Sequence, residues 1–340
     1  MKNKIITEFT ISELTDALKE LNEPAFRAKQ IHEWIYRKNA SSWDDMTNLS
    51  KELRRKCAEN WRFNAVEETE SVKSDDGTEK LLLKLHDGEF IEMVIIPTDK
   101  RITFCLSTQV GCPVGCLFCA SGRNGLTRNL SMAEIIGEFQ AGCAKIGSLP
   151  DNIVFMGIGE GLLNFENLTA AVERLTSPVY FGMGVRRITI STSGFVPGML
   201  KLAELGKELN LAISLHAPND EIRQQIIPGK LRYPIAEIMD AADVFREKCN
   251  RMPTIEYTLL KNVNDSADCA KALAVIAAQH HTKVNLIPYN NTDCGFQRPS
   301  DKTINNFEQI LNRANIAVSV RRERGSDRAG ACGQLRADHM

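Results

Sequence analysis

Three cysteines stand close together in the chain, at Cys112, Cys116 and Cys119. In a reducing compartment such closely spaced thiols rarely form disulfides, and a metal ion or metal cluster explains them better. Zinc usually takes four ligands, often as two separated cysteine pairs, and no second pair is visible in this sequence. Three thiolates on one tight loop suit an iron–sulfur cubane, which normally takes four cysteines. With only three, one iron keeps an open position where a small molecule can bind.

The spacing Cys-x3-Cys-x2-Cys resembles that of the radical S-adenosylmethionine (SAM) enzymes. In those enzymes the open iron chelates the amino and carboxylate groups of SAM and donates an electron that breaks its sulfonium bond. Gly111, Gly115 and Gly122 strengthen this interpretation, because glycine lets the backbone fold tightly around a bulky inorganic core. From the motif alone, the alternatives are a structural zinc ion or three unrelated thiols.

Length, composition and charge restrict the protein class. The 340 residues suffice for one large domain with a smaller attachment, and the 43% of hydrophobic residues supports an ordinary core. The net charge of −1 gives no overall signal for nucleic acid, so an RNA-binding surface would be a local patch. No apolar run approaches the about 20 residues of a membrane span, and no signal-peptide hydrophobic region follows Met1. Ten cysteines without a secretory signal indicate reduced thiols, so we expect a cytoplasmic protein without membrane association.

Residues 1–62 are predicted to form a helical module. A capping box at Thr10–Glu13 starts the first helix, and a second helix is expected over Ala25–Lys38. A third helix, over about Leu49–Trp61, is expected to expose the basic residues Lys51, Arg54, Arg55 and Lys56. This basic face is either an ordinary solvated helix surface or a site of RNA contact.

Residues 63–98 carry strand and hairpin signals. Strands are predicted over Val66–Val72, Glu79–Leu85 and Glu89–Ile96, with turns at Ser74–Gly77 and His86–Gly88. Glu92 shares the parity of Phe90, Val94 and Ile96 in the last strand. We therefore expect its carboxylate to face an enclosed space, where burial would disfavour the charged form and tune it as a base. The alternative is an edge-strand glutamate that points at water.

From residue 104 to 322, strand and helix signals alternate, which predicts parallel strands with outer helices. The predicted strands are Phe104–Thr108, Ile153–Met156, Arg187–Ser191, Leu211–Leu215, Thr254–Leu260, Val284–Ile287 and Ala317–Arg321. The span is short for a full eight-unit barrel of about 250 residues, so an open or partial barrel is expected. The predicted fold is therefore α/β: a partial (β/α) barrel over residues 99–340, with the helical module 1–62 and the hairpin extension 63–98.

Small polar residues recur where these predicted strands end, which is where a barrel collects its chemistry. Gly157–Gly161 follows the second strand and offers backbone groups and the carboxylate of Glu160 to an ammonium group. Further polar segments follow the third, fourth and sixth strands, at Ser191–Gly194, Ser214–Asp220 and Pro288–Asn291. Together they suit the hydrogen-bonding needs of a ribose and an adenine. The tail Gly325–Leu335 has three glycines and no periodicity, which predicts a flexible loop carrying one thiol, Cys332.

Four segments carry a resemblance to a known family. They are Phe104-Cys105-Leu106-Ser107-Thr108-Gln109-Val110-Gly111-Cys112, the Gly159-Glu160 turn, residues 214–223, and Ala331-Cys332-Gly333-Gln334-Leu335. Taken together they resemble the RlmN/Cfr family of radical SAM RNA adenine methyltransferases, and within it the RlmN branch, which methylates carbon 2 of adenosine in 23S rRNA and tRNA. The similarity extends from the N-terminal helices to the tail.

The resemblance implies a role for each matching residue. Cys112, Cys116 and Cys119 would hold a [4Fe–4S] cluster. The SAM contacts would be Gly159, Glu160, Ser191, Ser214, Leu215, His216 and Asn290. The catalytic residues would be Glu92 as proton acceptor, Cys332 as the site of an S-methyl intermediate, and Cys105 as the thiol that resolves it.

The implied reaction uses two SAM molecules. The first methylates Cys332, and the second yields a radical that removes a hydrogen atom from the S-methyl group. The resulting carbon radical adds to the adenine, and Cys105 then attacks the sulfur of Cys332 and releases the methylated base. Such a route avoids polar methyl transfer to carbon 2, which is electron-poor and has no acidic proton. The implied partners are 23S rRNA, tRNA and an electron donor such as flavodoxin or ferredoxin, and the chain is expected to be a monomer.

The sequence departs from the family at two places. Gly161 stands where the family has proline, which would reduce the rigidity of the SAM turn. The tail reads Asp327-Arg328-Ala329-Gly330-Ala331-Cys332, where the family has Asp-Ile-Asp-Ala-Ala-Cys, so an arginine replaces an aliphatic residue. Neither change removes a catalytic atom.

Two other activities fit parts of the pattern. The first is the Cfr-like methylation of carbon 8, although residues 162–164 and 214–223 favour carbon 2. The second is a non-catalytic RNA-binding or ribosome-assembly protein with a structural metal. Cys105, Cys332 and Glu92 argue against the second, because a binding module has no need of two redox thiols around a cluster.

Overall fold

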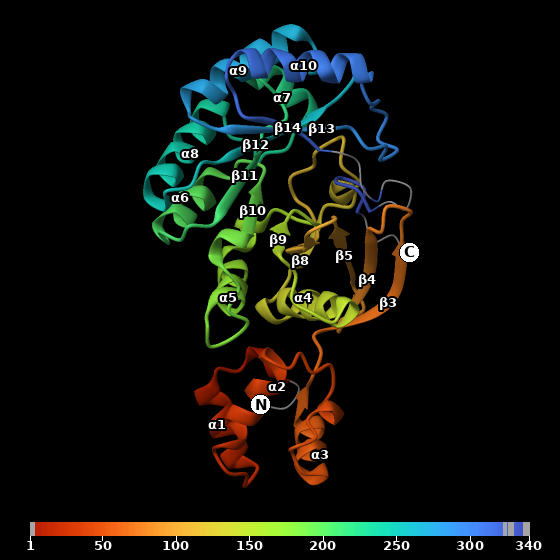
Figure 1. The fold of residues 1–340 in the computed structure, drawn as a ribbon, viewed down its shortest axis with the longest axis vertical. Coiled ribbons are helices and arrows are strands. Elements are labelled where there is room, and N and C mark those ends of the chain that lie inside the picture. The colour runs from red at the N-terminus through yellow and green to blue at the C-terminus, as the bar shows by residue number, and fades with distance from the viewer. Residues whose placement is uncertain (1–3, 322–324, 326–329, 336–340) are drawn as a thin grey trace.

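A ten-stranded sheet forms the centre of the molecule in the computed structural model, which describes residues 4–321, 325 and 330–335 (Figure 1). Seven neighbouring strands are parallel and follow one another in chain order. They are β6 (Ile102–Cys105), β9 (Asn152–Phe155), β10 (Ile188–Thr192), β11 (Asn210–Ser214), β12 (Thr254–Leu259), β13 (Lys283–Pro288) and β14 (Val318–Val320). All seven match predicted strands, with ends that differ by a few residues.

Helices connect successive parallel strands, as the alternating pattern predicts. In chain order they are α4 (Met132–Ile146), α5 (Phe165–Thr176), α6 (Val196–Glu204), α7 (Asp220–Ile226), α8 (Ile235–Cys249), α9 (Ala267–Gln279) and α10 (Asp301–Arg313). In Figure 1 these helices lie on the outside of the curved sheet. The sheet begins at β14 and ends at β3 (Val66–Lys73), so it forms an open barrel and confirms the predicted partial barrel.

The predicted hairpin segment is part of the same sheet. Strands β3, β4 (Glu79–Leu85) and β5 (Phe90–Pro97) pair antiparallel, and β5 pairs antiparallel with β6. The hairpins therefore extend the barrel sheet rather than standing beside it. A separate two-stranded ribbon, β7 (Gln109–Gly111) with β8 (Leu126–Asn129), encloses the cysteine loop at its base.

The N-terminal helices form a module below the sheet (Figure 1). It contains α1 (Ile11–Glu20), α2 (Arg27–Tyr36), α3 (Lys51–Asn60) and a short parallel pair, β1 (Lys4–Ile5) with β2 (Trp61–Arg62). Thr10 caps α1 by accepting a hydrogen bond from the Glu13 amide at 3.2 Å, as the predicted capping box requires.

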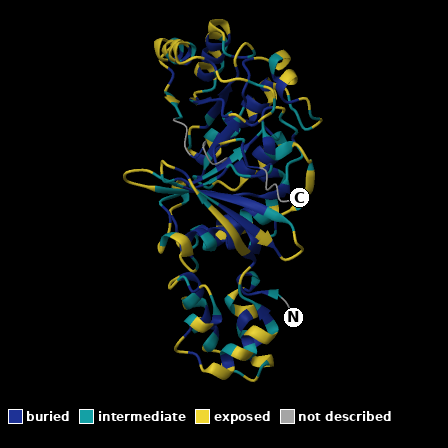
Figure 2. Ribbon diagram, turned by 90° about the vertical axis from the view of Figure 1, so that its right-hand side faces the viewer, coloured by how far each residue is buried: buried dark blue, intermediate teal, exposed yellow. Residues whose placement is uncertain are grey.

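The N-terminal module shares its core with the barrel. The Tyr36 ring packs edge-on against Tyr180 and Phe181, with ring centroids 4.9 and 5.0 Å apart. One cluster of mutually packed, buried apolar side chains includes residues of both parts, from Ile5 in the N-terminal module to Ile316 in the barrel. In Figure 2 the buried ribbon lies in the middle of the molecule. Within the residues described here, no helix is long and apolar enough to cross a membrane.

Candidate active site

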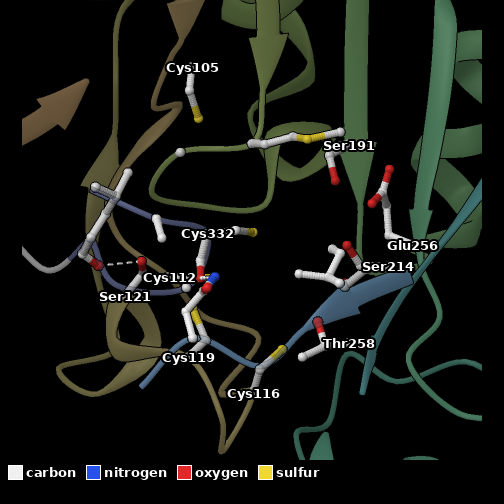
Figure 3. A pocket seen from close by; sticks show the side chains of 18 of the residues that line it. Cys105, Cys112, Cys116, Cys119, Ser121, Ser191, Ser214, Glu256, Thr258 and Cys332 are labelled. Carbon is white, nitrogen blue, oxygen red and sulfur yellow. Dashed lines mark hydrogen bonds between the residues drawn. The ribbon is translucent and has the colours of Figure 1, made fainter. Parts of the chain in front are cut away.

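A large pocket opens at the carboxyl ends of the parallel strands. It contains about 1190 Å³ of empty space, part of which is open to solvent. All five predicted cysteines, Cys105, Cys112, Cys116, Cys119 and Cys332, line it. In Figure 3 the Cys105 side chain points from one side toward Cys332, and the three predicted ligands lie on the other side.

The loop that carries Cys112, Cys116 and Cys119 is held from both ends. Gly111 lies at φ +74°, and a Cβ added there would come within 2.0 Å of the Gly125 carbonyl oxygen, so only glycine fits. The Cys112 amide donates to that same oxygen at 2.8 Å, and the Cys119 amide donates to the Cys116 carbonyl at 3.1 Å. The tight turn that the glycines predict is therefore present.

The environment of these three thiols is apolar and crowded. Burial, followed by the proximity of the neighbouring cysteines, raises the pKa of Cys116 well above its usual value, and burial raises that of Cys112 to about 12. Over the described ranges, no three His, Cys, Asp or Glu side chains are placed to hold a single metal ion. A cubane spreads its cysteine ligands over different irons, so the donor set fits a polynuclear cluster with three protein thiolates.

The loop with Cys332 is fastened to the other two loops of the site. The Ala120 amide, next to Cys119, donates to the Gly333 carbonyl at 2.8 Å. Asn290 Nδ2 donates to the Cys332 carbonyl at 3.1 Å, and Gln334 Nε2 donates to the Asn291 carbonyl at 2.8 Å. Cys332 is exposed as a residue, but its thiol faces the pocket, where reduced contact with water raises its pKa.

Cys105 ends β6 and is almost fully buried. It packs in a small apolar cluster with Val94, Ile158 and Leu335, so one wall of the Cys105 site is supplied by the Cys332 loop. Burial raises the pKa of the Cys105 thiol to about 12. All ten cysteines are free thiols in this structure.

The Gly157–Gly161 segment forms the predicted turn after β9. Gly159 lies at φ +113°, where a Cβ would come within 2.7 Å of Gln109, so the position requires glycine. Glu160 is buried, and its carboxylate accepts hydrogen bonds from the Ser193 amide at 2.6 Å and the Leu162 amide at 3.2 Å. Gly161 is the first residue of a 3₁₀ turn, a position where proline is tolerated but not required, so the turn forms without it.

Six of the seven predicted SAM contacts line the pocket, and one does not. Gly159, Glu160, Ser191, Ser214, His216 and Asn290 line the pocket with the cysteines. Leu215 does not, because its side chain is fully buried in the main core. Its carbonyl instead accepts a hydrogen bond from Arg223 Nε at 3.2 Å, and Arg223 Nη2 donates to the Ser193 carbonyl. Arg223 thus ties together the loops that follow β10 and β11.

His216 is fixed as a neutral imidazole. Its Nδ1 accepts a hydrogen bond from the Thr258 amide at 3.0 Å, and its ring packs edge-on against Phe118 at 5.0 Å. Burial lowers the pKa of His216 to about 3. The ring therefore presents an uncharged Nε2–H as its remaining polar group.

Glu92 lies in an enclosed space, as its parity in the strand predicts, and does not point at water. It is 4% exposed, and Lys80 Nζ on β4 lies 2.7 Å from its carboxylate. Glu92 is not itself a lining residue of the pocket, but Val94 and Ile96, on the same face of β5, are. The Glu92 carboxylate is therefore enclosed on the face of β5 that supplies two lining residues, and it is paired with a cation.

The polar lining residues that the sequence analysis did not assign to the site include Glu256, Thr258 and Arg321. Glu256 and Thr258 alternate with apolar residues along β12. Polar residues on one face of a buried strand could have indicated that this face lines a site. Glu256 is buried and accepts a hydrogen bond from Asn285 Nδ2 at 2.7 Å. Burial raises the pKa of Glu256.

The predicted basic surface is smaller than expected. The Arg54 side chain is only 16% exposed and is paired with Asp44, and Lys56 pairs with Glu23 at 2.7 Å. Both predictions of exposed side chains were therefore wrong, because the module uses these charges internally. Lys51 and Arg55 are exposed on α3. Two further arginines lie near the C-terminus. Arg321, at the end of a predicted strand, lines the pocket, and Arg328 lies outside the described residues.

A second buried carboxylate supports the site from behind. Glu138 on α4 is fully buried and accepts a hydrogen bond from the Ser107 amide at 3.0 Å. Ser107 Oγ in turn donates to the Glu92 carbonyl at 2.7 Å and accepts from the Ile158 amide at 2.9 Å. Burial raises the pKa of Glu138 well above its ordinary value of 4.5.

This raised pKa predicts a pH-dependent stability. Because the folded state holds the Glu138 proton more tightly than the unfolded state does, its contribution is complete below pH 4.5 and is lost as the pH rises toward the folded-state pKa. Glu138→Gln has no proton to lose at this position. As the pH rises within that window, the free energy of unfolding of the wild type should therefore fall relative to that of the variant, by up to about 1.4 kcal/mol per pH unit. Urea denaturation at several pH values measures the difference. Glu166→Gln, exposed on α5, is the control, and parallel pH curves for wild type and Glu138→Gln would contradict the prediction.

Known proteins resemble both parts of the chain. A family model described as the ribosomal RNA large subunit methyltransferase N-terminal domain matches residues 6–62, and the radical SAM superfamily model matches residues 106–271. A crystal structure of a radical SAM methyltransferase from Sphaerobacter thermophilus superposes with a TM-score of 0.94 and 41% sequence identity. The match covers 98% of this chain and 100% of that one.

Curated relatives match over nearly their whole length. A protein of Akkermansia muciniphila named probable dual-specificity RNA methyltransferase RlmN is 43% identical over 98% of this chain and 95% of its own length. The dual-specificity RNA methyltransferase RlmN of Geotalea uraniireducens is 43% identical over 99% of this chain and 97% of its own length. The chain therefore belongs to the RlmN family of radical SAM methyltransferases, which use a [4Fe–4S] cluster and SAM.

Proposed function

We propose that the chain methylates carbon 2 of an adenosine in 23S rRNA and in tRNA through an S-methylcysteine intermediate. The observation that carries this proposal is the gathering of Cys105, Cys332 and three cluster-type cysteines around one pocket. A structural metal would need only the last three. Two further thiols at the same pocket suit a reaction in which one sulfur carries carbon and the other displaces it.

The pocket offers ligands for both cofactors. Cys112, Cys116 and Cys119 would hold the cluster, and Gly159, Glu160, Ser191, Ser214, His216 and Asn290 would surround SAM. When bound, these cofactors supply the methyl group, one electron and the means of removing a hydrogen atom. The side-chain oxygen of Asn290 is buried and has no hydrogen-bond partner in the described part of the chain. This is expected of an acceptor that bonds to a ligand.

Cys332 and Cys105 would act in sequence. Cys332 Sγ receives the methyl group, and its carbon, after losing one hydrogen atom, bonds to adenine carbon 2. Glu92, paired with Lys80, would accept the proton that leaves carbon 2, and the unpaired electron of the ring would pass to the cluster. Cys105 Sγ then attacks Cys332 Sγ, so that the sulfur–carbon bond breaks and the methylated adenine leaves with a new proton. The two sulfurs end as a disulfide, which an external dithiol reduces.

The remaining partners follow from this chemistry. We propose RNA contact through the helical module 1–62, with Lys51 and Arg55 on its exposed face, while residues 63–98 and 99–340 form the hairpin extension and the catalytic core. An electron donor such as flavodoxin or ferredoxin would reduce the cluster. We further propose that the chain acts as a monomer in the cytoplasm.

Nucleoside analysis tests the proposed function. RNA from a deletion strain complemented with the wild-type gene should contain 2-methyladenosine, measured by mass spectrometry of digested 23S rRNA and tRNA. Complementation with Cys332→Ala should leave the level at that of the deletion strain, because no sulfur carries the carbon. Accumulation of 8-methyladenosine instead would move the activity to carbon 8, and no change in either nucleoside would contradict the proposal.

A further inference from the structure

Asn290 lines the pocket and contacts the Cys332 loop. It follows β13 and is 8% exposed. Its Nδ2 donates to the Cys332 carbonyl at 3.1 Å. A carbonyl can only accept, so the amide nitrogen must face Cys332 and the amide oxygen must face the other way. That oxygen is buried and, among the described residues, has no hydrogen-bond partner.

The other contacts of the loop do not share this arrangement. Gln334 Nε2 donates to the Asn291 carbonyl, and Gln334 Oε1 accepts from the Ala331 amide at 3.0 Å, so both ends of its amide are satisfied within the protein. The Gly333 carbonyl accepts from the Ala120 amide. These contacts fasten the loop whether or not the pocket is filled. Asn290 is different, because it lines the pocket, its Nδ2 holds the Cys332 carbonyl, and its buried Oδ1 has no partner among the described residues.

We propose that Asn290 couples occupation of the SAM pocket to docking of the Cys332 loop. A donor of the adenosyl ligand, such as a ribose hydroxyl, bonds to Asn290 Oδ1 and fixes the amide plane, and the fixed Nδ2 then holds the Cys332 carbonyl. The proposal rests on the proposed function, since it takes the ligand to be SAM or its demethylated product. Asn290 would then hold the Cys332 loop against the pocket when the cofactor is bound.

Coupling of this kind follows from the cost of ordering one side chain. A hydrogen bond at either end of the amide requires the same side-chain conformation, so whichever bond forms first removes most of the entropic cost of the second. The effect must be reciprocal: if the ligand favours the docked loop, the docked loop favours the ligand by the same factor. A single hydrogen bond supports a coupling of about tenfold.

Hydrogen exchange on the cluster-loaded protein tests this coupling without relying on turnover. S-adenosylhomocysteine serves as the probe, because it keeps the adenosine, amino and carboxylate groups of SAM but has no methyl group to transfer. Exchange of the peptide containing residues 330–335 is followed by mass spectrometry, and affinity is measured by calorimetry. In the wild type, saturating probe should slow this exchange by about tenfold.

Three variants separate the two ends of the amide. Asn290→Asp keeps an acceptor toward the ligand but replaces the donor, so it should show no slowing of the loop and, because the coupling is reciprocal, bind the probe about tenfold more weakly than the wild type. Asn290→Ala loses the acceptor as well, so it should show no slowing even at saturation and bind the probe more weakly still than Asn290→Asp. Gln334→Ala, the matched control, should exchange faster at rest but keep the response to the probe.

The outcomes distinguish the inference from the function on which it rests. Equal slowing of residues 330–335 in saturated wild type and Asn290→Ala would overturn the coupling, as would an unchanged response in Asn290→Asp. Loss of the response in Gln334→Ala would also overturn it, because any loop contact would then serve. Failure of the wild-type holoprotein to bind the probe would instead contradict the proposed function, and the coupling with it.

Discussion

Cys105→Ala is expected to leave the protein covalently attached to RNA. In the proposed reaction Cys105 breaks the bond between Cys332 Sγ and the adenine-bound carbon, so without it the intermediate has no exit. Cys105 and Leu335 belong to one apolar cluster, which brings the Cys332 loop against Cys105 and makes direct attack feasible. A disulfide requires Cα atoms roughly 4.4–6.8 Å apart, so the Cys332 loop must bring its thiol within that range of Cys105 when the bond forms.

The measurement is a denaturing gel of the Cys105→Ala protein purified from cells, with and without ribonuclease. A nuclease-sensitive shift should appear, and peptide mapping should locate the attached nucleotide on Cys332. Cys332→Ala and the double variant should show no shift, because neither has a sulfur to carry the carbon. Methylation at the wild-type rate by Cys332→Ala would exclude the scheme. So would a Cys105→Ala protein that retains the cluster and cleaves SAM but forms no adduct.

Replacing any one of Cys112, Cys116 and Cys119 with alanine is expected to abolish turnover. Each thiolate would hold a different iron, so two cannot substitute for three. The anaerobically purified wild type should contain about four irons and four sulfides per chain, while the variants should lose most of the iron. We expect SAM cleavage to fall by at least about a thousandfold, since the step depends on the cluster.

Iron analysis, absorption spectra and an assay of SAM cleavage measure these effects. Cys294→Ser is the matched control, because Cys294 is half-buried near the site but does not line the pocket, and the variant should keep its iron and its activity. An active protein that contains stoichiometric zinc in place of iron would be incompatible with a cluster at these three residues.

The sequence predicted the barrel and most of the pocket because both depend on local patterns. Alternation of strand and helix signals placed all seven parallel strands, and polar residues at their carboxyl ends marked Ser191, Ser214 and His216. Parallel strands bring their carboxyl ends to one edge, so residues far apart in sequence had to meet there. The parity of Glu92 within its strand likewise predicted an enclosed carboxylate.

The sequence could not predict which of two neighbouring side chains enters the pocket or how charges pair over long separations. Leu215 lies in the core while Ser214 and His216 line the pocket, although the resemblance implied all three as SAM contacts. Arg54 and Lys56 occupy positions typical of a solvated basic face, but Asp44 and Glu23 reach them from other segments of the module.

The sequence alone determined the chemistry of this protein, because the spacing of Cys112, Cys116 and Cys119 and the presence of Cys105 and Cys332 are local properties of the chain. Only the tertiary structure decided how these groups meet. Cys332 lies more than two hundred residues after Cys105, and the contacts of its loop with Ala120, Asn290 and Asn291 form only when β6 and β13 belong to the same curved sheet. Loop contacts of this kind depend on assembly of the whole sheet, which no local pattern of residues encodes.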